Sequence, residues 1–134
     1  MEASARVEPA WGVDSEYGAL LDVLLCPPDT FKWLPTSAIS RATLDAGLVF
    51  SRDDAMRQHA EMVSVYSEAG VEVHFLEDDP ALPYQVFARD SSINLPEGPI
   101  VTQCAQWWRR GEYAPVIRFY QEHDIPIKNM VTAG

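Results

Sequence analysis

The stretch that decides the fold is DDAMRQHAEMVSVYSEAGVEVHFL, residues 53–76. Apolar side chains recur every three or four positions through residues 53–69, which predicts a helix with one buried stripe. The stripe comprises Met56, Ala60, Val63 and Tyr66. Gly70 is expected to end this helix. Residues 71–76 then alternate apolar and polar side chains, which is typical of a half-exposed strand with Val71, Val73 and Phe75 on one face. A helix that leads directly into a strand indicates an α/β chain.

Similar signals extend outward from this stretch in both directions. We expect strands at 19–26, 84–90, 92–95, 100–104 and 125–130, and a second helix from 111 to about 124. Residues 96–98 should turn the chain between two strands of a hairpin. Residues 36–50 fit a helical turn followed by irregular chain. The element order then describes two similar units, within a single domain 1–134 that begins with a flexible lead, residues 1–14.

Composition limits the classes of function. The chain has 134 residues, 47% of them hydrophobic, which suffices for one domain with a core. A net charge of −10 argues against nucleic-acid binding, which requires a cationic surface. No apolar run is long enough to cross a membrane, and no signal peptide is visible. We therefore expect a cytoplasmic protein with neither a nucleic acid nor a membrane as partner.

Cysteine and histidine spacing favours neither a metal nor a cofactor. Cys26 and Cys104 each follow an apolar run and lack metal-ligand spacing, so both are expected to be inert thiols in a reducing compartment. His59, His74 and His123 form no HExxH pattern. On the alternating strand, His74 is expected to be a surface residue rather than a ligand.

The stretch VFARD, residues 86–90, is the most informative for function. It reads as a short strand that ends on Phe87, Arg89 and Asp90. An aromatic face and a nearby carboxylate are suited to a flat cation such as a guanidinium, which stacks on the ring and donates paired hydrogen bonds to the carboxylate. The alternative is a packed phenylalanine beside a turn-capping aspartate.

Two further segments carry side chains with open roles. The loop 29–35 contains Phe31 and Trp33, which are either half-buried anchors or part of a flap over a site. Arg109 and Arg110 precede the second helix, where the helix dipole disfavours positive charge. They are either a solvated helix start or anion-binding groups.

In combination these segments resemble a known family. Four motifs occur in the order found there: Tyr17-Gly18 before a strand, Gln58-His59 within a helix, Val86-Phe87-Ala88-Arg89-Asp90, and Arg109-Arg110-Gly111-Glu112. They resemble the guanidino-modifying superfamily of dimethylarginine dimethylaminohydrolases, arginine deiminases and amidinotransferases, with bacterial dimethylarginine dimethylaminohydrolase-like proteins most similar. The resemblance extends from about Tyr17 to the end of the chain. It implies a five-unit α/β propeller, of which this chain would form about two N-terminal units.

The resemblance also implies a mechanism and a set of substrate-binding residues. In the family a cysteine attacks the guanidinium carbon and forms a covalent amidino intermediate, and a histidine serves as general acid and base. By analogy Asp90 holds the guanidinium, with Phe87 and Arg89 beside it. Arg109 or Arg110 holds the substrate carboxylate, and Arg109 is favoured. The expected flap carries Phe31, Trp33 and Leu34.

The chain departs from the family pattern in one respect. The family's Glu-Gly-Gly-Asp segment, histidine and late cysteine are expected beyond Gly134, and neither Cys26 nor Cys104 matches the nucleophile. We therefore expect the substrate-binding part of an amidine hydrolase for arginine or a methylated arginine, inactive alone and paired with itself or with the missing C-terminal part. The alternatives are a non-catalytic binding module and an amidinotransferase.

Overall fold

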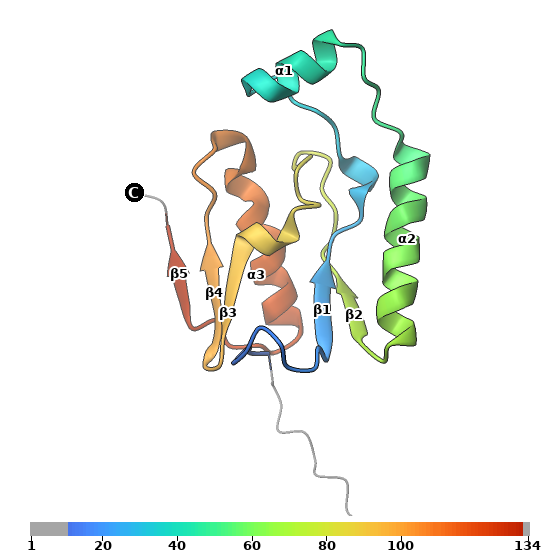
Figure 1. Ribbon diagram of the computed structural model, residues 1–134. Helices are drawn as coiled ribbons and strands as arrows, with labels where there is room; N and C mark the ends of the chain where they lie inside the picture. Colours follow the sequence, from blue (N-terminus) through green and yellow to red (C-terminus); the bar gives the residue numbers. More distant parts are fainter. Residues whose placement is uncertain (1–10, 133–134) are drawn as a thin grey trace, which may run out of the picture. The chain divides into compact units, whose positions relative to one another are not determined.

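The structure is a computed structural model that describes residues 11–132 (Figure 1). Its internal contacts group the chain into two units, and each is described by itself. Leu21–Ala88 forms one unit, called here the first unit. The segments on either side of it, residues 11–20 and 89–132, form the second unit.

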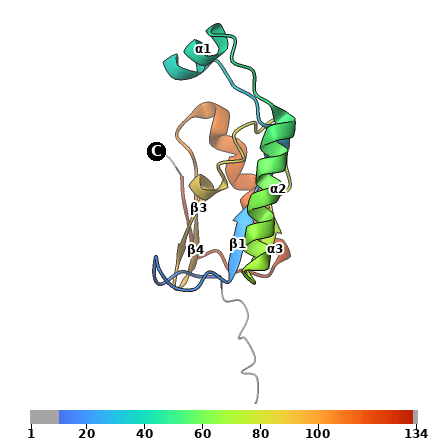
Figure 2. The same cartoon turned by 45° about the vertical axis from the view of Figure 1, so that its right-hand side comes forward.

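The first unit is built around a strand-helix-strand crossover. Strand β1 (Asp22–Leu25) pairs in parallel with β2 (Glu72–Phe75), and α2 (Arg52–Glu68) connects them. Helix α2 contacts β2, and Figure 1 shows it on the β2 side of the strand pair. The turned view of Figure 2 brings α2 to the front. The predicted helix is confirmed, since Ser51 accepts a hydrogen bond from the Asp54 amide and Gly70 follows with a φ of 80°.

The buried faces of α2 and β2 differ in part from the prediction. Ala60 is exposed, and His59 occupies the inner face instead, with its ring centroid 6.2 Å from that of Phe75. The prediction of Ala60 as a stripe residue was wrong, because at about 100° per residue Met56, His59, Val63 and Tyr66 fall within a narrower arc of the helix than a set that includes Ala60. Phe75 remains 47% exposed, so the helix covers only part of its ring.

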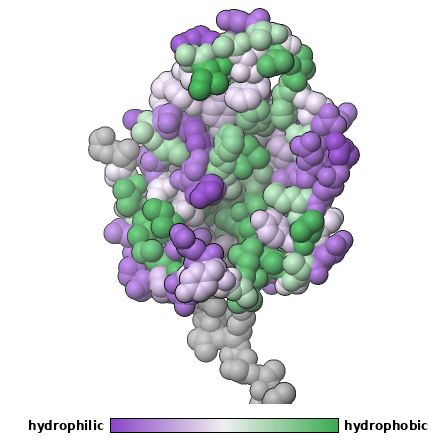
Figure 3. Space-filling view, viewed as in Figure 1, coloured by the Kyte–Doolittle hydropathy of each residue, from purple (hydrophilic) through white to green (hydrophobic). Residues whose placement is uncertain are grey.

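An additional helix lies between β1 and α2, in the part predicted as a helical turn. It is α1 (Ala38–Asp45), which follows the short 3-10 helix η1 (Pro28–Thr30). Ser37 and Ser40 form a reciprocal capping box at its start. Apolar side chains are exposed on and just after α1, and Figure 3 shows apolar surface there. They are Ile39, Leu44, Leu48 and Val49.

The second unit contains the predicted hairpin and a second crossover. Strands β3 (Ser92–Leu95) and β4 (Gly98–Thr102) pair antiparallel, and β5 (Asn129–Val131) lies parallel to β4. Helix α3 (Tyr113–Glu122) connects β4 to β5 and follows the 3-10 helix η3 (Trp107–Glu112). Val101 on β4 packs in a core with residues of α3 and the turn after it. Its members are Val116, Phe119, Tyr120 and Ile125.

The strand predicted at residues 84–90 was wrong. Local bonds dominate there: the Gln85 amide donates to the Leu82 carbonyl and the Phe87 amide to the Tyr84 carbonyl, both at 3.0 Å. Turns therefore lead into a short 3-10 helix, η2 (Ala88–Ser91). The buried Gln85 side chain reinforces this path through hydrogen bonds with the backbone of Glu77 and Asp79.

The predicted flexible lead, residues 1–14, falls mostly on residues 1–10, which lie outside the described part of the chain. Trp11 is packed, with its ring centroid 5.3 Å from Phe119 and 6.2 Å from Tyr120. Trp11 is therefore not part of a flexible lead. Among the described residues, no helix is both long and apolar enough to span a membrane.

Candidate functional site

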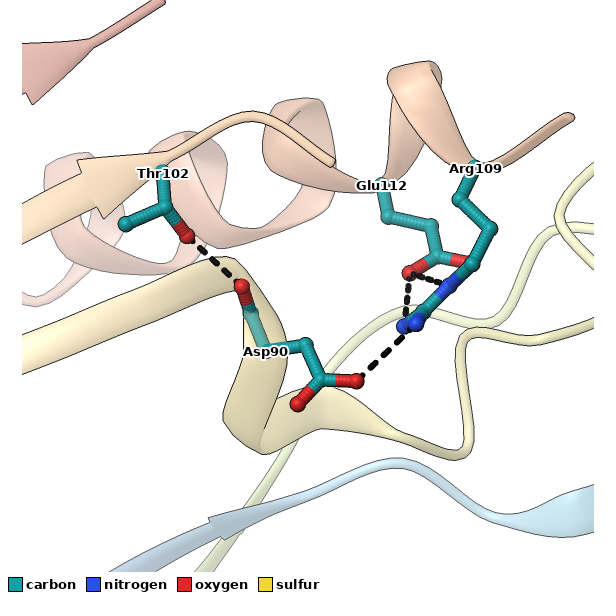
Figure 4. A network of polar contacts seen from close by, with 4 residues as sticks. All are labelled: Asp90, Thr102, Arg109 and Glu112. Carbon is teal, nitrogen blue, oxygen red and sulfur yellow. Dashed lines mark hydrogen bonds and ion pairs between the residues drawn. The ribbon is translucent and has the colours of Figure 1, made fainter. Parts of the chain in front are cut away.

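A cluster of polar side chains in the second unit brings together residues from three elements (Figure 4). Asp90 lies in η2, Thr102 ends β4, and Arg109 and Glu112 lie in η3. Arg109 and Glu112 are three positions apart, so one helical turn places them on the same face. The fold thus joins segments separated by up to 22 positions in the sequence, from Asp90 to Glu112.

Arg109 is the centre of the cluster. Its Nε and Nη2 atoms donate to the Glu112 carboxylate at 3.0 and 2.8 Å, which is the paired geometry that an arginine fork prefers. Its Nη1 donates to Oδ2 of Asp90 at 2.9 Å. The Thr102 hydroxyl donates to the Asp90 carbonyl at 2.6 Å and fixes the backbone from which the carboxylate projects (Figure 4).

Burial is graded across the cluster. The side chain of Glu112 is 2% exposed, that of Arg109 is 13% exposed, and that of Asp90 is 44% exposed. Two carboxylates share one guanidinium, which leaves an excess of negative charge. Because Asp90 is the exposed member, this charge is available to a second cation at its open side.

The protonation of the cluster follows from the same contacts. Burial raises the pKa of Glu112, against the opposing effect of Arg109. Burial alone would lower the pKa of Arg109, but hydrogen bonds to Glu112 and Asp90 outweigh it and raise that pKa. Arg109 is therefore positively charged at any physiological pH.

Cys104 is electrostatically coupled to this cluster but is not activated by it. Burial raises the pKa of its thiol, Glu112 and Asp90 raise it further, and Arg109 opposes them. A cysteine nucleophile needs a lowered pKa, because the thiolate is the reactive form. That Cys104 is not the nucleophile stays a prediction.

Two of the remaining predicted site residues, Arg89 and Arg110, are exposed. Within residues 11–132 no ion pair involves either of them. Arg109 was the preferred candidate for binding a substrate carboxylate. In the structure its side chain already forms ion pairs with two carboxylates of the protein, Asp90 and Glu112. Sequence reasoning missed Thr102 and the role of Glu112. The Arg-x-x-Glu spacing was the signal that would have identified the second.

The predicted aromatic and flap residues gather in the first unit, around Phe31. Its ring is 7% exposed and lies 5.3 Å from Trp33, 4.8 Å from Phe50 and 6.3 Å from Phe87, between centroids. Tyr84 belongs to the same cluster, and its hydroxyl accepts a hydrogen bond from the Leu34 amide at 3.0 Å. Phe31 is therefore an anchor, and the flap stays a prediction for Trp33 and Leu34. Phe87 is 48% exposed, so part of its ring is accessible.

Comparison with known proteins identifies the family. The family model described as N,N dimethylarginine dimethylhydrolase, eukaryotic, matches residues 36–132. The chain belongs to this family. The predicted membership of the guanidino-modifying superfamily is thereby confirmed.

Individual relatives show how much of such a protein the chain represents. It is 29% identical over 119 residues to the uncharacterized protein YkgA of Bacillus subtilis strain 168, covering 87% of this chain and 41% of YkgA. The dimethylarginine dimethylaminohydrolase of Pseudomonas aeruginosa, solved in complex with citrulline, superposes with a TM-score of 0.65 and 18% identity, over 86% of this chain and 42% of that one. The chain thus spans about two fifths of these relatives.

A second group of similar structures comes from cyanobacteria. ArgZ, an arginine dihydrolase of the ornithine-ammonia cycle, superposes with a TM-score of 0.69 and 16% identity, covering 85% of this chain and 16% of ArgZ. Its N-terminal domain, solved with bound product, gives a TM-score of 0.65 and is covered to 40%. These similarities show a shared mixed α/β fold.

Proposed function

We propose that this chain is the N-terminal, substrate-binding part of an amidine hydrolase that acts on arginine or a methylated arginine. The observation that carries the proposal is the Asp90–Arg109–Glu112 cluster. It presents one half-exposed carboxylate, held in place from behind, with surplus negative charge. A guanidinium is the cation whose paired N–H groups match that carboxylate.

Each residue has a definite role in this proposal. Asp90 binds the substrate guanidinium, and Arg109 holds Asp90 while Glu112 neutralises Arg109. Phe87 and Arg89 are further substrate-binding residues by the family resemblance. Arg110, which is exposed, meets the substrate carboxylate, because two carboxylates of the protein already pair with Arg109. Trp33 and Leu34 belong to a flap that excludes water, with Phe31 as its anchor.

The cysteine nucleophile and the histidine are supplied by sequence outside these 134 residues. This chain contributes about two of the five units of a propeller, which correspond to the crossovers β1–α2–β2 and β4–α3–β5. The raised pKa of Cys104 supports this assignment, because a thiol that resists ionisation does not attack a guanidinium carbon.

The test is a substitution in the complete protein encoded by the gene. Asp90→Asn keeps the shape of the side chain and removes its charge. Because a hydrogen bond to a charged group contributes about 1.5–3 kcal/mol, we expect kcat/KM for citrulline release to fall about 10- to 100-fold. Asp78→Asn, in the acidic loop of the first unit, is the matched control. An unchanged kcat/KM for Asp90→Asn refutes the role of Asp90.

The isolated 134-residue chain is expected not to turn over arginine or methylated arginines, because no ionisable cysteine and histidine are paired in the Asp90 cluster. Incubation of the pure chain with each substrate, followed by a citrulline assay, checks this. Steady release that Asp90→Ala abolishes would contradict it.

A further inference from the structure

Three side chains with metal-binding atoms meet on one face of the β1–β2 pair, in the first unit. They are Asp22, Glu72 and His74. The parallel register places Asp22 opposite Glu72 and Leu24 opposite His74. Residues opposite each other, and residues two apart on one strand, point to the same face of a sheet. Pairing of β1 with β2 is therefore what assembles this trio.

The trio lies on the face of the strand pair that does not carry Phe75. His59 of α2 contacts the ring of Phe75, and Phe75 points away from His74 because consecutive strand residues alternate. The helix therefore covers the opposite face of the pair.

The distances suit a shared metal ion. The ligand atoms of the three residues all lie within 4.8 Å of one another, and Nε2 of His74 is 3.1 Å from Oδ1 of Asp22. Ligands on a tetrahedral zinc ion, with bonds of about 2.0–2.2 Å, are about 3.3–3.6 Å apart. Glu72 is exposed, so rotation of its side chain can close the remaining distance.

Electrostatics favours a cation at this position. Asp22 and Glu72 are directly opposed carboxylates, and like charges across a strand pair destabilise it. A positive ion bound by both carboxylates reduces this repulsion. The net charge of −10 also raises the local concentration of cations around the chain.

We propose that Asp22, Glu72 and His74 form a binding site for a divalent transition-metal ion, with zinc as the best match. One imidazole nitrogen and two carboxylates are ligands that zinc accepts, whereas magnesium and calcium prefer oxygen ligands alone. The ion would link β1 to β2, because its ligands come from both strands, and thereby stabilise the first unit. This site is separate from the Asp90 cluster, and the proposed hydrolase function does not depend on it.

The test starts from the 134-residue chain after treatment with a chelator and dialysis. This metal-free chain is titrated with zinc chloride. We expect a single zinc ion to bind, measured by calorimetry, and a rise in Tm on binding. Cobalt(II) bound in place of zinc should show the visible absorption of a four-coordinate site. Magnesium chloride should give no binding. His74→Ala and Glu72→Gln should each weaken zinc binding by at least about tenfold and abolish the rise in Tm.

His123→Ala is the matched control, since His123 lies in the second unit and is exposed. It should bind zinc as the unmodified chain does. If His74→Ala does not fold, by circular dichroism, Glu72→Gln decides the question because its side chain is exposed and isosteric. The proposal is overturned if the unmodified chain binds no zinc, if both variants bind it unchanged, or if His123→Ala loses binding equally.

Discussion

Glu112 is the residue on which the candidate site depends most for its geometry. Its nearly inaccessible carboxylate is matched by two donor atoms of Arg109, and Arg109 in turn reaches Asp90. A buried charge that loses its partner is expensive, because water cannot replace the lost interaction. The half-exposed Asp90 is thus positioned by a residue that has no accessible surface for a ligand of its own.

We predict that Glu112→Gln lowers the free energy of unfolding by about 3 kcal/mol, the low end for a broken buried pair, because Asp90 still pairs with Arg109. Urea denaturation followed by circular dichroism measures this. Glu122→Gln at the exposed end of α3 is the control and should change stability by less than about 0.5 kcal/mol. Equal stability of the two variants would show that the Glu112 pair contributes little.

A second prediction concerns His59 and the dependence of stability on pH. Burial lowers its pKa, and its Nε2 atom is buried without a hydrogen-bond partner in the described part of the chain. Below the ordinary histidine pKa of about 6.5, the unfolded chain takes up a proton that the folded chain refuses. The free energy of unfolding should therefore fall as the pH drops from about 6.5 toward the lowered value.

His59→Leu should make the dependence of stability on pH shallower between pH 5 and 7, as measured by urea denaturation at a series of pH values. His123→Gln, at the end of α3, serves as the comparison. The same slope in the His59→Leu variant and the unmodified chain would mean that His59 does not contribute.

At the scale of elements, the stability of helix α1 depends on its N-terminal cap. Only Ser40 within it is buried, so packing contributes little. The Ser37 hydroxyl accepts a hydrogen bond from the Ser40 amide, and the Ser40 hydroxyl accepts one from the Ser37 amide. Ser37→Ala should destabilise α1 by about 1 kcal/mol. Amide exchange should become faster in α1 and stay unchanged in α2. Ser64→Ala, exposed within α2, is the control, and faster exchange in that variant would argue against a capping effect.

At the scale of the whole molecule, exposed apolar surface and open strand edges should govern association. Strand β5 pairs only with β4 among the described strands, and its Met130 and Val131 are 44% and 54% exposed. Edges of this kind invite pairing with another chain. We therefore expect the isolated chain to self-associate at tens of micromolar.

Val131→Lys should shift this equilibrium toward monomer, because a charge on an edge strand opposes further pairing. Sedimentation velocity measures the distribution. Val49→Lys, which places the same charge on the apolar surface after α1, is the control for a general gain in solubility. A purely monomeric unmodified chain would contradict the prediction.

Local sequence signals were sufficient for most of the elements. The periodicity of residues 53–69, the glycine after them, and the turn before β4 predicted α2, β2 and the hairpin, because each depends on contacts between near neighbours. The order of strands and helices followed from the same signals. Family membership could also be predicted from the sequence, because it rests on short motifs that occur in a fixed order.

Only the tertiary structure decided where the chemistry lies. Residues 84–90 form turns because the buried Gln85 side chain holds the backbone of Glu77 and Asp79, and no local pattern encodes that burial. The pairing of Arg109 with Asp90, and the meeting of Asp22 with His74, required β-strand register and helix placement across long sequence separations. Charge pairing is a property of distance in space, and the sequence determines that distance only through the packing of the whole chain.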